Sequence, residues 1–92
     1  MNFLRLDVTA DTITTFDFKK KGYKFIIKNF TDDDIYIGIN STDTKDKMLK
    51  LPSDKMQYFE INEDVKSEYG VQKIYVIANE TTLQGVEIQC IK

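Results

Sequence analysis

Three consecutive acids, Asp32, Asp33 and Asp34, come closest to metal chemistry in this chain of 92 residues. Calcium is bound by several converging oxygens, and an EF-hand loop supplies them from alternating acids around a central glycine. The three acids are adjacent instead of alternating, so that register is absent. A polar turn between a strand that ends at Phe30 and one that starts at Ile35 accounts for the run. We therefore expect no metal site.

The side chains that most enzymes use are missing. The sequence has no histidine and one cysteine, Cys90, which removes Ser-His-Asp and Cys-His arrangements and the commonest metal ligand. It also has neither a G-x-G-x-x-G segment nor a Walker loop. A pair of carboxylates is the remaining catalytic option, as in glycoside hydrolysis, but so small a chain has little room for the cleft. We expect no enzymatic activity and no cofactor.

The charge pattern argues against nucleic acid and membrane as partners. The net charge is −2, whereas nucleic-acid binders carry a concentrated basic face. The one basic run, Lys19 to Lys21, precedes Gly22 and is read as a solvated turn. No stretch approaches the length of about 20 apolar residues that a membrane-spanning helix needs. The N-terminal residues do not follow the pattern of a signal peptide.

Apolar and polar residues alternate along almost the whole chain, which is typical of strands with one buried face. Polar segments rich in Asp, Asn, Ser and Gly separate the alternating runs and are read as turns. One polar segment, residues 62–70, has room for a single helical turn. The expected strands are 3–8, 12–18, 23–30, 35–40, 48–51, 56–61, 73–78 and 85–92.

Eight short strands with regular turns predict an all-β fold, a single antiparallel β-sandwich of jelly-roll or immunoglobulin-like type. One such domain accounts for residues 1–92. Cys90 falls on the apolar side of its strand, so we expect it to face the core. The edge strands, for example 2–8 or 84–91, offer backbone groups with which a neighbouring chain can pair.

Some strands are apolar on both sides. Residues 25–27 are Phe-Ile-Ile and residues 75–77 are Tyr-Val-Ile. Such an excess is consistent with a second core face or with a surface that meets another chain, and the sequence does not separate the two.

Tyrosines are the candidate interface residues. Tyr36 and Tyr75 lie opposite the aliphatic side of their strands, and Tyr58 and Tyr23 are further candidates. Tyrosine rings are common at protein and sugar surfaces. The alternative is that they border a small core with the hydroxyl in water.

Three segments carry a resemblance to a known group. Lys28 to Asp34, Lys50 to Ser53 and Val86 to Gln89 resemble the turns and closing strand of small β-proteins from tailed bacteriophages of low-GC Gram-positive bacteria. Such proteins are minor capsid or head-decoration proteins. Leu51 stands where isoleucine is common in that pattern. The resemblance covers most of the chain after residue 23 and carries no catalytic residue across.

The resemblance implies a structural protein of the phage head, made in the host cytoplasm and located in the virion. Its partners would be the major capsid protein, other virion proteins, or further copies of itself. Two alternatives remain open: a module that binds a host surface or carbohydrate, such as a fibre-attachment domain, and a phage inhibitor of a host protein.

Overall fold

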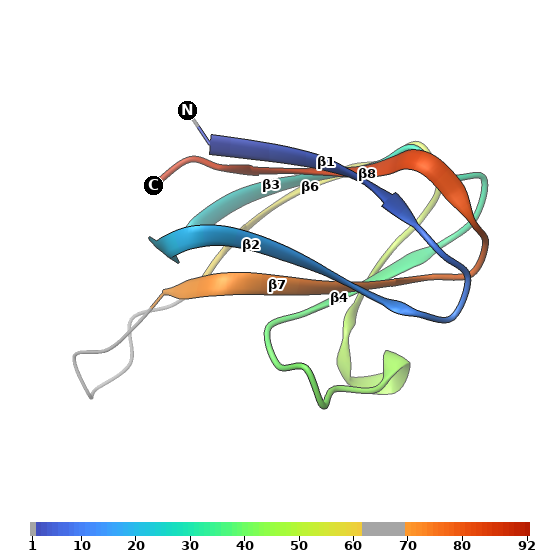
Figure 1. The fold of residues 1–92 in the computed structure, drawn as a ribbon, viewed down its shortest axis with the longest axis horizontal. Helices are drawn as coiled ribbons and strands as arrows, with labels where there is room; N and C mark the ends of the chain where they lie inside the picture. The colour runs from blue at the N-terminus through green and yellow to red at the C-terminus, as the bar shows by residue number, and fades with distance from the viewer. Residues whose placement is uncertain (1, 62–69) are drawn as a thin grey trace.

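The computed structural model describes residues 2–61 and 70–92 and contains two four-stranded antiparallel sheets packed together (Figure 1). The all-β sandwich of eight strands expected from the alternation is therefore confirmed. The helical turn considered for residues 62–70 falls almost entirely on 62–69, outside the described residues. The elements are β1 (Asn2–Val8), β2 (Ile13–Gly22), β3 (Lys24–Asn29), β4 (Ile35–Gly38), the short 3-10 helix η1 (Lys45–Lys47), β5 (Leu49–Leu51), β6 (Met56–Glu60), β7 (Val71–Ala78) and β8 (Thr82–Cys90).

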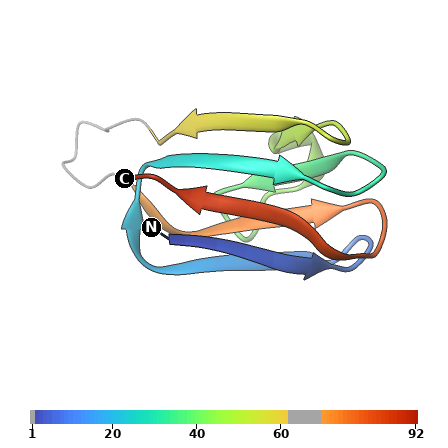
Figure 2. The same cartoon turned by 90° about the horizontal axis from the view of Figure 1, so that it is seen from above.

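The strand order is that of a jelly roll. One sheet has the order β1-β8-β3-β6 and the other β2-β7-β4-β5 (Figure 2). The antiparallel pairs are nested, since β1 pairs with β8, β2 with β7, β3 with β6 and β4 with β5. An immunoglobulin-like sandwich instead pairs its first two strands within one sheet. The order therefore decides between the two architectures that the sequence left open.

Inward-pointing side chains of both sheets form a single core. Phe25 on β3 is fully buried, and its ring centroid lies 5.6 Å from that of Phe18 and 5.3 Å from that of Phe59. Burying a side chain of this size stabilises the fold by about 1.5–3 kcal/mol. Cys90 faces this core, as its position in the alternation predicted. The buried apolar residues are Val8, Phe16, Phe18, Phe25, Ile27, Ile35, Ile37, Leu51, Ile74, Val76, Ala78, Val86, Ile88 and Cys90.

The lysine run is part of a strand, so the prediction of a turn there was wrong. Lys19 to Lys21 continue β2, which ends at Gly22. Lys19 has a positive φ of 67° and its N–H donates to Asp17 Oδ1 over 2.9 Å. The pairing of β2 with β7 shifts register between Asp17 and Gly22. A local irregularity of this kind lets a strand continue through residues that cannot maintain the ladder.

One of the two proposed edge strands is not an edge. β1 lies at the margin of its sheet, but β8 pairs with β1 on one side and with β3 on the other. Alternation reports how many faces of a strand are buried and says nothing of its neighbours. The pairing of Asn2 with Cys90 also places the two ends of the chain side by side (Figure 1).

A buried amide joins the two sheets at the end of β3. Asn29 Nδ2 donates to the carbonyls of Leu51 on β5, over 3.0 Å, and of Asp33, over 2.8 Å. Asn29 Oδ1 accepts the Thr31 N–H over 2.9 Å. Ser53 Oγ donates to the Thr31 carbonyl over 2.6 Å. These bonds fix the segment between β3 and β4, which is rich in aspartate.

Candidate interaction surface

The outer face of the β1-β8-β3-β6 sheet carries a row of side chains in register. Phe3 pairs with Gln89, Gln89 with Ile26, and Ile26 with Tyr58, so one row crosses all four strands. The sequence neighbours Leu4, Ile88 and Phe25 lie in or against the core, so the alternation turns this row to solvent. Phe3 is 54% exposed and Tyr58 45% exposed. The row is therefore apolar at both margins of the sheet.

A second row lies beside the first. Arg5 pairs with Glu87, Glu87 with Lys28, and Lys28 with Met56, which is 62% exposed. Phe30 follows β3, is 46% exposed, and has the Arg5 guanidinium carbon 5.6 Å from its ring centroid. The apolar members of this face are called the outer band here: Phe3, Ile26, Phe30, Met56 and Tyr58.

An ion-pair network lies beside the outer band. Arg5 donates to Glu87 Oε1 from Nε over 3.0 Å and from a terminal nitrogen over 2.5 Å, and Lys28 Nζ lies 3.5 Å from Glu87 Oε2. The hydrogen bonds from Arg5 and the charge of Lys28 hold the pKa of the Glu87 carboxyl below its usual 4.5, against the opposing effect of burial. Glu87 stays charged although its side chain is 9% exposed.

The network also restrains one side chain of the outer band, Phe30. Arg5 bonds Glu87 on one side and lies over the Phe30 ring on the other. A guanidinium within about 6 Å of a ring is attracted to its face. Arg5 therefore orders an exposed aromatic side chain, which lowers the entropy that binding a partner would cost.

The outer face of the β2-β7-β4-β5 sheet has fewer exposed apolar side chains than the outer band. Tyr36 on β4 and Tyr75 on β7 point outward there and are half-buried. Lys45 Nζ lies 5.2 Å from the centroid of the Tyr36 ring and bonds Asn79 Oδ1 over 2.7 Å. Of the described apolar side chains that point outward from this sheet, Ile13 is the most exposed, at 41%. This face is therefore a weaker apolar surface than the outer band.

The four tyrosines predicted as interface residues do not share one surface. Tyr36 and Tyr75 lie on the outer face of the β2-β7-β4-β5 sheet, and Tyr58 lies on the outer face of the other sheet. Tyr23 stands between β2 and β3, half-buried, with its N–H bonded to the Lys92 carbonyl over 2.7 Å. Tyr58 is the tyrosine that the structure brings together with the outer band. Whether any of the four contacts a partner stays a prediction.

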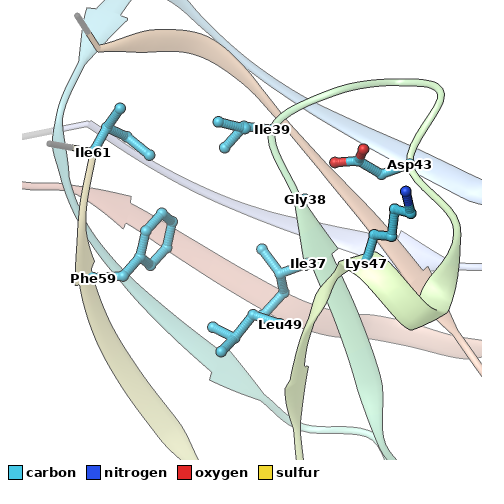
Figure 3. A pocket seen from close by; sticks show the side chains of 8 residues that line it. All are labelled: Ile37, Gly38, Ile39, Asp43, Lys47, Leu49, Phe59 and Ile61. Atoms are coloured by element: carbon cyan, nitrogen blue, oxygen red, sulfur yellow. The ribbon is translucent and has the colours of Figure 1, made fainter. Parts of the chain in front are cut away.

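An apolar pocket of about 300 Å³ opens between the two sheets where β4 and β5 face β6 (Figure 3). Asp43 and Lys47 are its charged lining residues, and both come from the segment between β4 and β5. Gly38 permits this segment to approach, because a Cβ there would lie 3.1 Å from both Asp43 Oδ2 and Met48 Cε. The apolar lining residues are Ile37, Ile39, Leu49, Phe59 and Ile61.

Asp32, Asp33 and Asp34 each make a polar contact within the protein. Asp33 Oδ1 accepts the Asp34 N–H over 2.7 Å, and Asp34 Oδ2 lies 3.5 Å from Lys50 Nζ. The Asp32 N–H donates to Glu80 Oε1 over 2.6 Å. Within residues 2–61 and 70–92, no group of three or more Cys, Asp or Glu side chains is placed to hold a metal ion. The run forms the polar connection between β3 and β4.

Sequence reasoning missed Phe3, Phe30 and Met56 as surface residues. The signal that existed was the run of three apolar residues through Ile26, which allowed either a second core face or a surface. The structure places Ile26 on the outer face, half-buried. Phe3 and Met56 join it only through the order β1-β8-β3-β6, which no local pattern reports.

Among the described residues, no helix is long and apolar enough to cross a membrane. Comparison of the chain with protein-family models, with curated proteins and with solved structures found no match.

Proposed function

We propose that this chain is a structural protein of a phage particle, associated with the head, that binds a neighbouring virion protein through the outer band. The observation that carries the proposal is the grouping of Phe3, Phe30, Met56 and Tyr58, each at least 45% exposed, on one face of a sheet. Exposed apolar side chains that gather on one face beside charged residues are typical of protein-interaction surfaces.

Two further points support the proposal. The segments Lys28 to Asp34, Lys50 to Ser53 and Val86 to Gln89 resemble small head proteins of tailed phages. Jelly rolls are also frequent among viral capsid domains, although fold alone does not assign function. A capsid lattice offers many equivalent sites, so a modest apolar surface is sufficient for stable attachment.

The test is the copy number of this chain in particles purified from the source phage, measured by quantitative mass spectrometry. A number on the order of hundreds per particle is expected for a protein that decorates the head lattice. About a dozen copies would move the protein to a vertex, neck or tail position. Absence from the particle would overturn the proposal and favour a host-directed inhibitor.

The outer band is tested by a matched pair of variants. Phe3→Thr combined with Met56→Thr removes two exposed apolar side chains while keeping strand propensity. Ile13→Thr makes the same kind of change on the opposite face of the sandwich. We expect the first variant to be depleted from particles at least tenfold and the second to be incorporated like the unchanged protein. Equal incorporation of both would show that the outer band is not the attachment surface.

A further inference from the structure

The pocket between β4, β5 and β6 shares no residue with the outer band and has the make-up of a small-molecule site (Figure 3). Its volume of about 300 Å³ is at the lower limit of ligand pockets, which range from about 300 to 1,000 Å³. Such pockets combine a mainly apolar lining with a few well-placed polar groups. Five apolar and two charged side chains line this pocket, so it suits a compact ligand with one ring or one branched chain.

The pocket opens to solvent along the segment that joins β4 to β5. Ile37, at the inner wall, is 4% exposed, whereas Ile39 and Leu49 are 41% and 44% exposed. Both exposed residues come from this segment or from the start of β5. A ligand can therefore reach the apolar lining from this side, and burial of these two side chains would favour its binding.

Two opposite charges lie at one side of the pocket. Figure 3 shows Asp43 and Lys47 on the side away from Phe59. Backbone turns fix both positions, since the Asp43 N–H donates to the Asn40 carbonyl over 3.1 Å and the Lys47 N–H donates to the Thr44 carbonyl over 2.8 Å. The pocket is therefore apolar at one side and carries an anion and a cation at the other.

Neither charge is neutralised by the part of the chain that the structure describes. The Asp43 carboxylate and the Lys47 ammonium make no hydrogen bond or ion pair with residues 2–61 or 70–92. Gly38 lets the carboxylate lie against β4, because a Cβ there would be 3.1 Å from Asp43 Oδ2. Asp43 is half-buried, so its carboxylate loses part of its hydration without gaining a partner. A ligand that brings an ammonium group would supply that partner.

We propose that this pocket binds a free α-amino acid with a large apolar side chain. The ammonium group of the ligand pairs with the Asp43 carboxylate, and its carboxylate pairs with the Lys47 ammonium. Its side chain packs among Ile39, Leu49 and Phe59. The inference does not depend on the proposed function, because it concerns the isolated chain and residues outside the outer band.

The two charges together select a zwitterion. An apolar amine would meet the like charge of Lys47 as well as the carboxylate of Asp43, and an apolar acid would meet the like charge of Asp43. Like charges brought together weaken binding. An α-amino acid carries an ammonium and a carboxylate on one carbon, so it pairs with both side chains at once and directs its apolar side chain into the pocket.

Four small molecules test the ligand class on the purified, unchanged chain. Phenylalanine has all three parts, 2-phenylethylamine lacks the carboxylate, 3-phenylpropionate lacks the ammonium, and glycine lacks the apolar side chain. NMR titration of the isotope-labelled chain, followed at the Gly38 amide, gives the dissociation constants. We expect saturable binding of phenylalanine, at least about fivefold tighter than that of each other probe. No saturation up to about 20 mM phenylalanine, or equal affinity for any other probe, would overturn the proposal.

Matched substitutions assign the two charges. Asp43→Asn should weaken phenylalanine binding about fivefold and leave 3-phenylpropionate binding no weaker, because that probe has no ammonium. Lys47→Gln should weaken phenylalanine binding by a similar factor and leave 2-phenylethylamine binding no weaker. Asp46→Asn and Lys50→Gln change the same charges nearby, outside the pocket lining, and should have no effect. Equal effects of the lining and control substitutions would contradict a role for Asp43 and Lys47.

The apolar part is tested by Leu49→Ala, with Leu83→Ala as the control outside the pocket. Both side chains are exposed, so both variants should keep the fold, which circular dichroism checks. We expect Leu49→Ala to weaken phenylalanine binding about threefold and Leu83→Ala to leave it unchanged. If Leu49→Ala does not fold, the comparison of the four probes, which requires no variant, still decides. Unchanged binding in the folded Leu49 variant would show that phenylalanine binds elsewhere.

Discussion

Glu87 shows at the scale of one residue how a charge is kept on a nearly buried side chain. Alternation alone directs Glu87 outward from β8, and in that respect the sequence was sufficient. Its low exposure arises from Arg5 on β1 and Lys28 on β3, which are 82 and 59 positions away in the chain. No local pattern reports which cations flank a carboxylate.

The lowered pKa of Glu87 predicts a pH-dependent contribution to stability. A carboxyl with a folded pKa below its unfolded value contributes fully above the unfolded value, about 4.5, and loses the contribution as pH falls through the folded pKa. Glu87→Gln should lower the free energy of unfolding by about 1–2 kcal/mol at pH 7 and by less at pH 3. Urea denaturation at the two pH values measures this. A cost independent of pH would show that Glu87 acts by packing and not by charge.

Substitution of Asn29 should lower the free energy of unfolding by more than substitution of Glu87, and by the same amount at both pH values. Asn29→Ala leaves the Leu51 carbonyl and the Thr31 N–H without the side-chain partner they have in the fold, and it leaves the Asp33 carbonyl with the Thr31 hydroxyl alone. Buried polar groups without partners cost about 1–3 kcal/mol each, and we expect a total loss of about 3 kcal/mol. Chemical denaturation measures it, with the exposed Asn40→Ala as control. A loss below about 0.5 kcal/mol would mean that other groups satisfy these atoms.

At the scale of elements, contact between strands determines which residue type fits at a given position, and composition does not report such contacts. Gly22 ends β2 where the strand approaches Cys90 on β8, and a Cβ at Gly22 would collide with Cys90 Sγ and lie 3.1 Å from the Phe25 ring. The sequence suggested a turn at Gly22 after the lysines. The structure shows instead that the lysine run continues the strand, and that close packing against Cys90 requires glycine at position 22.

This contact predicts coupling between two substitutions. Gly22→Ala alone should destabilise the fold by about 1–3 kcal/mol through overpacking against Cys90. Cys90→Ala removes the sulfur, so the double variant should be more stable than the sum of the single effects predicts, by at least about 0.5 kcal/mol. Thermal or urea unfolding of the four proteins gives the coupling. Additive effects would show that the strand end shifts to accommodate the methyl group.

At the scale of the whole molecule, the sequence was sufficient for the number of strands and for the two-sheet architecture. Period-two alternation and polar turns are local properties, and they predicted eight strands close to the observed ones. Strand order is not local. The pairing of β1 with β8 joins the two ends of the chain, which left jelly-roll and immunoglobulin-like order undecided and led to the wrong prediction that residues 84–91 form an edge.

The outer band also depends on strand order. Its residues come from β1, β3, β6 and the segment after β3, so they meet only once the order β1-β8-β3-β6 is known. The tyrosines chosen from sequence were found by residue type, and Tyr58 alone among them lies in the outer band. Position in the sheet therefore carries more information about a surface than residue type does.

The pairing of Asn2 with Cys90 also determines how the molecule responds to mechanical force. Tension applied at these two residues pulls β1 and β8 apart from one end, so their hydrogen bonds break one after another, like a zipper. Tension applied between Asn2 and Thr82, at opposite ends of the same antiparallel pair, runs along the strands and loads all of these bonds at once. Single-molecule pulling should therefore separate the strands at a lower force in the first geometry than in the second.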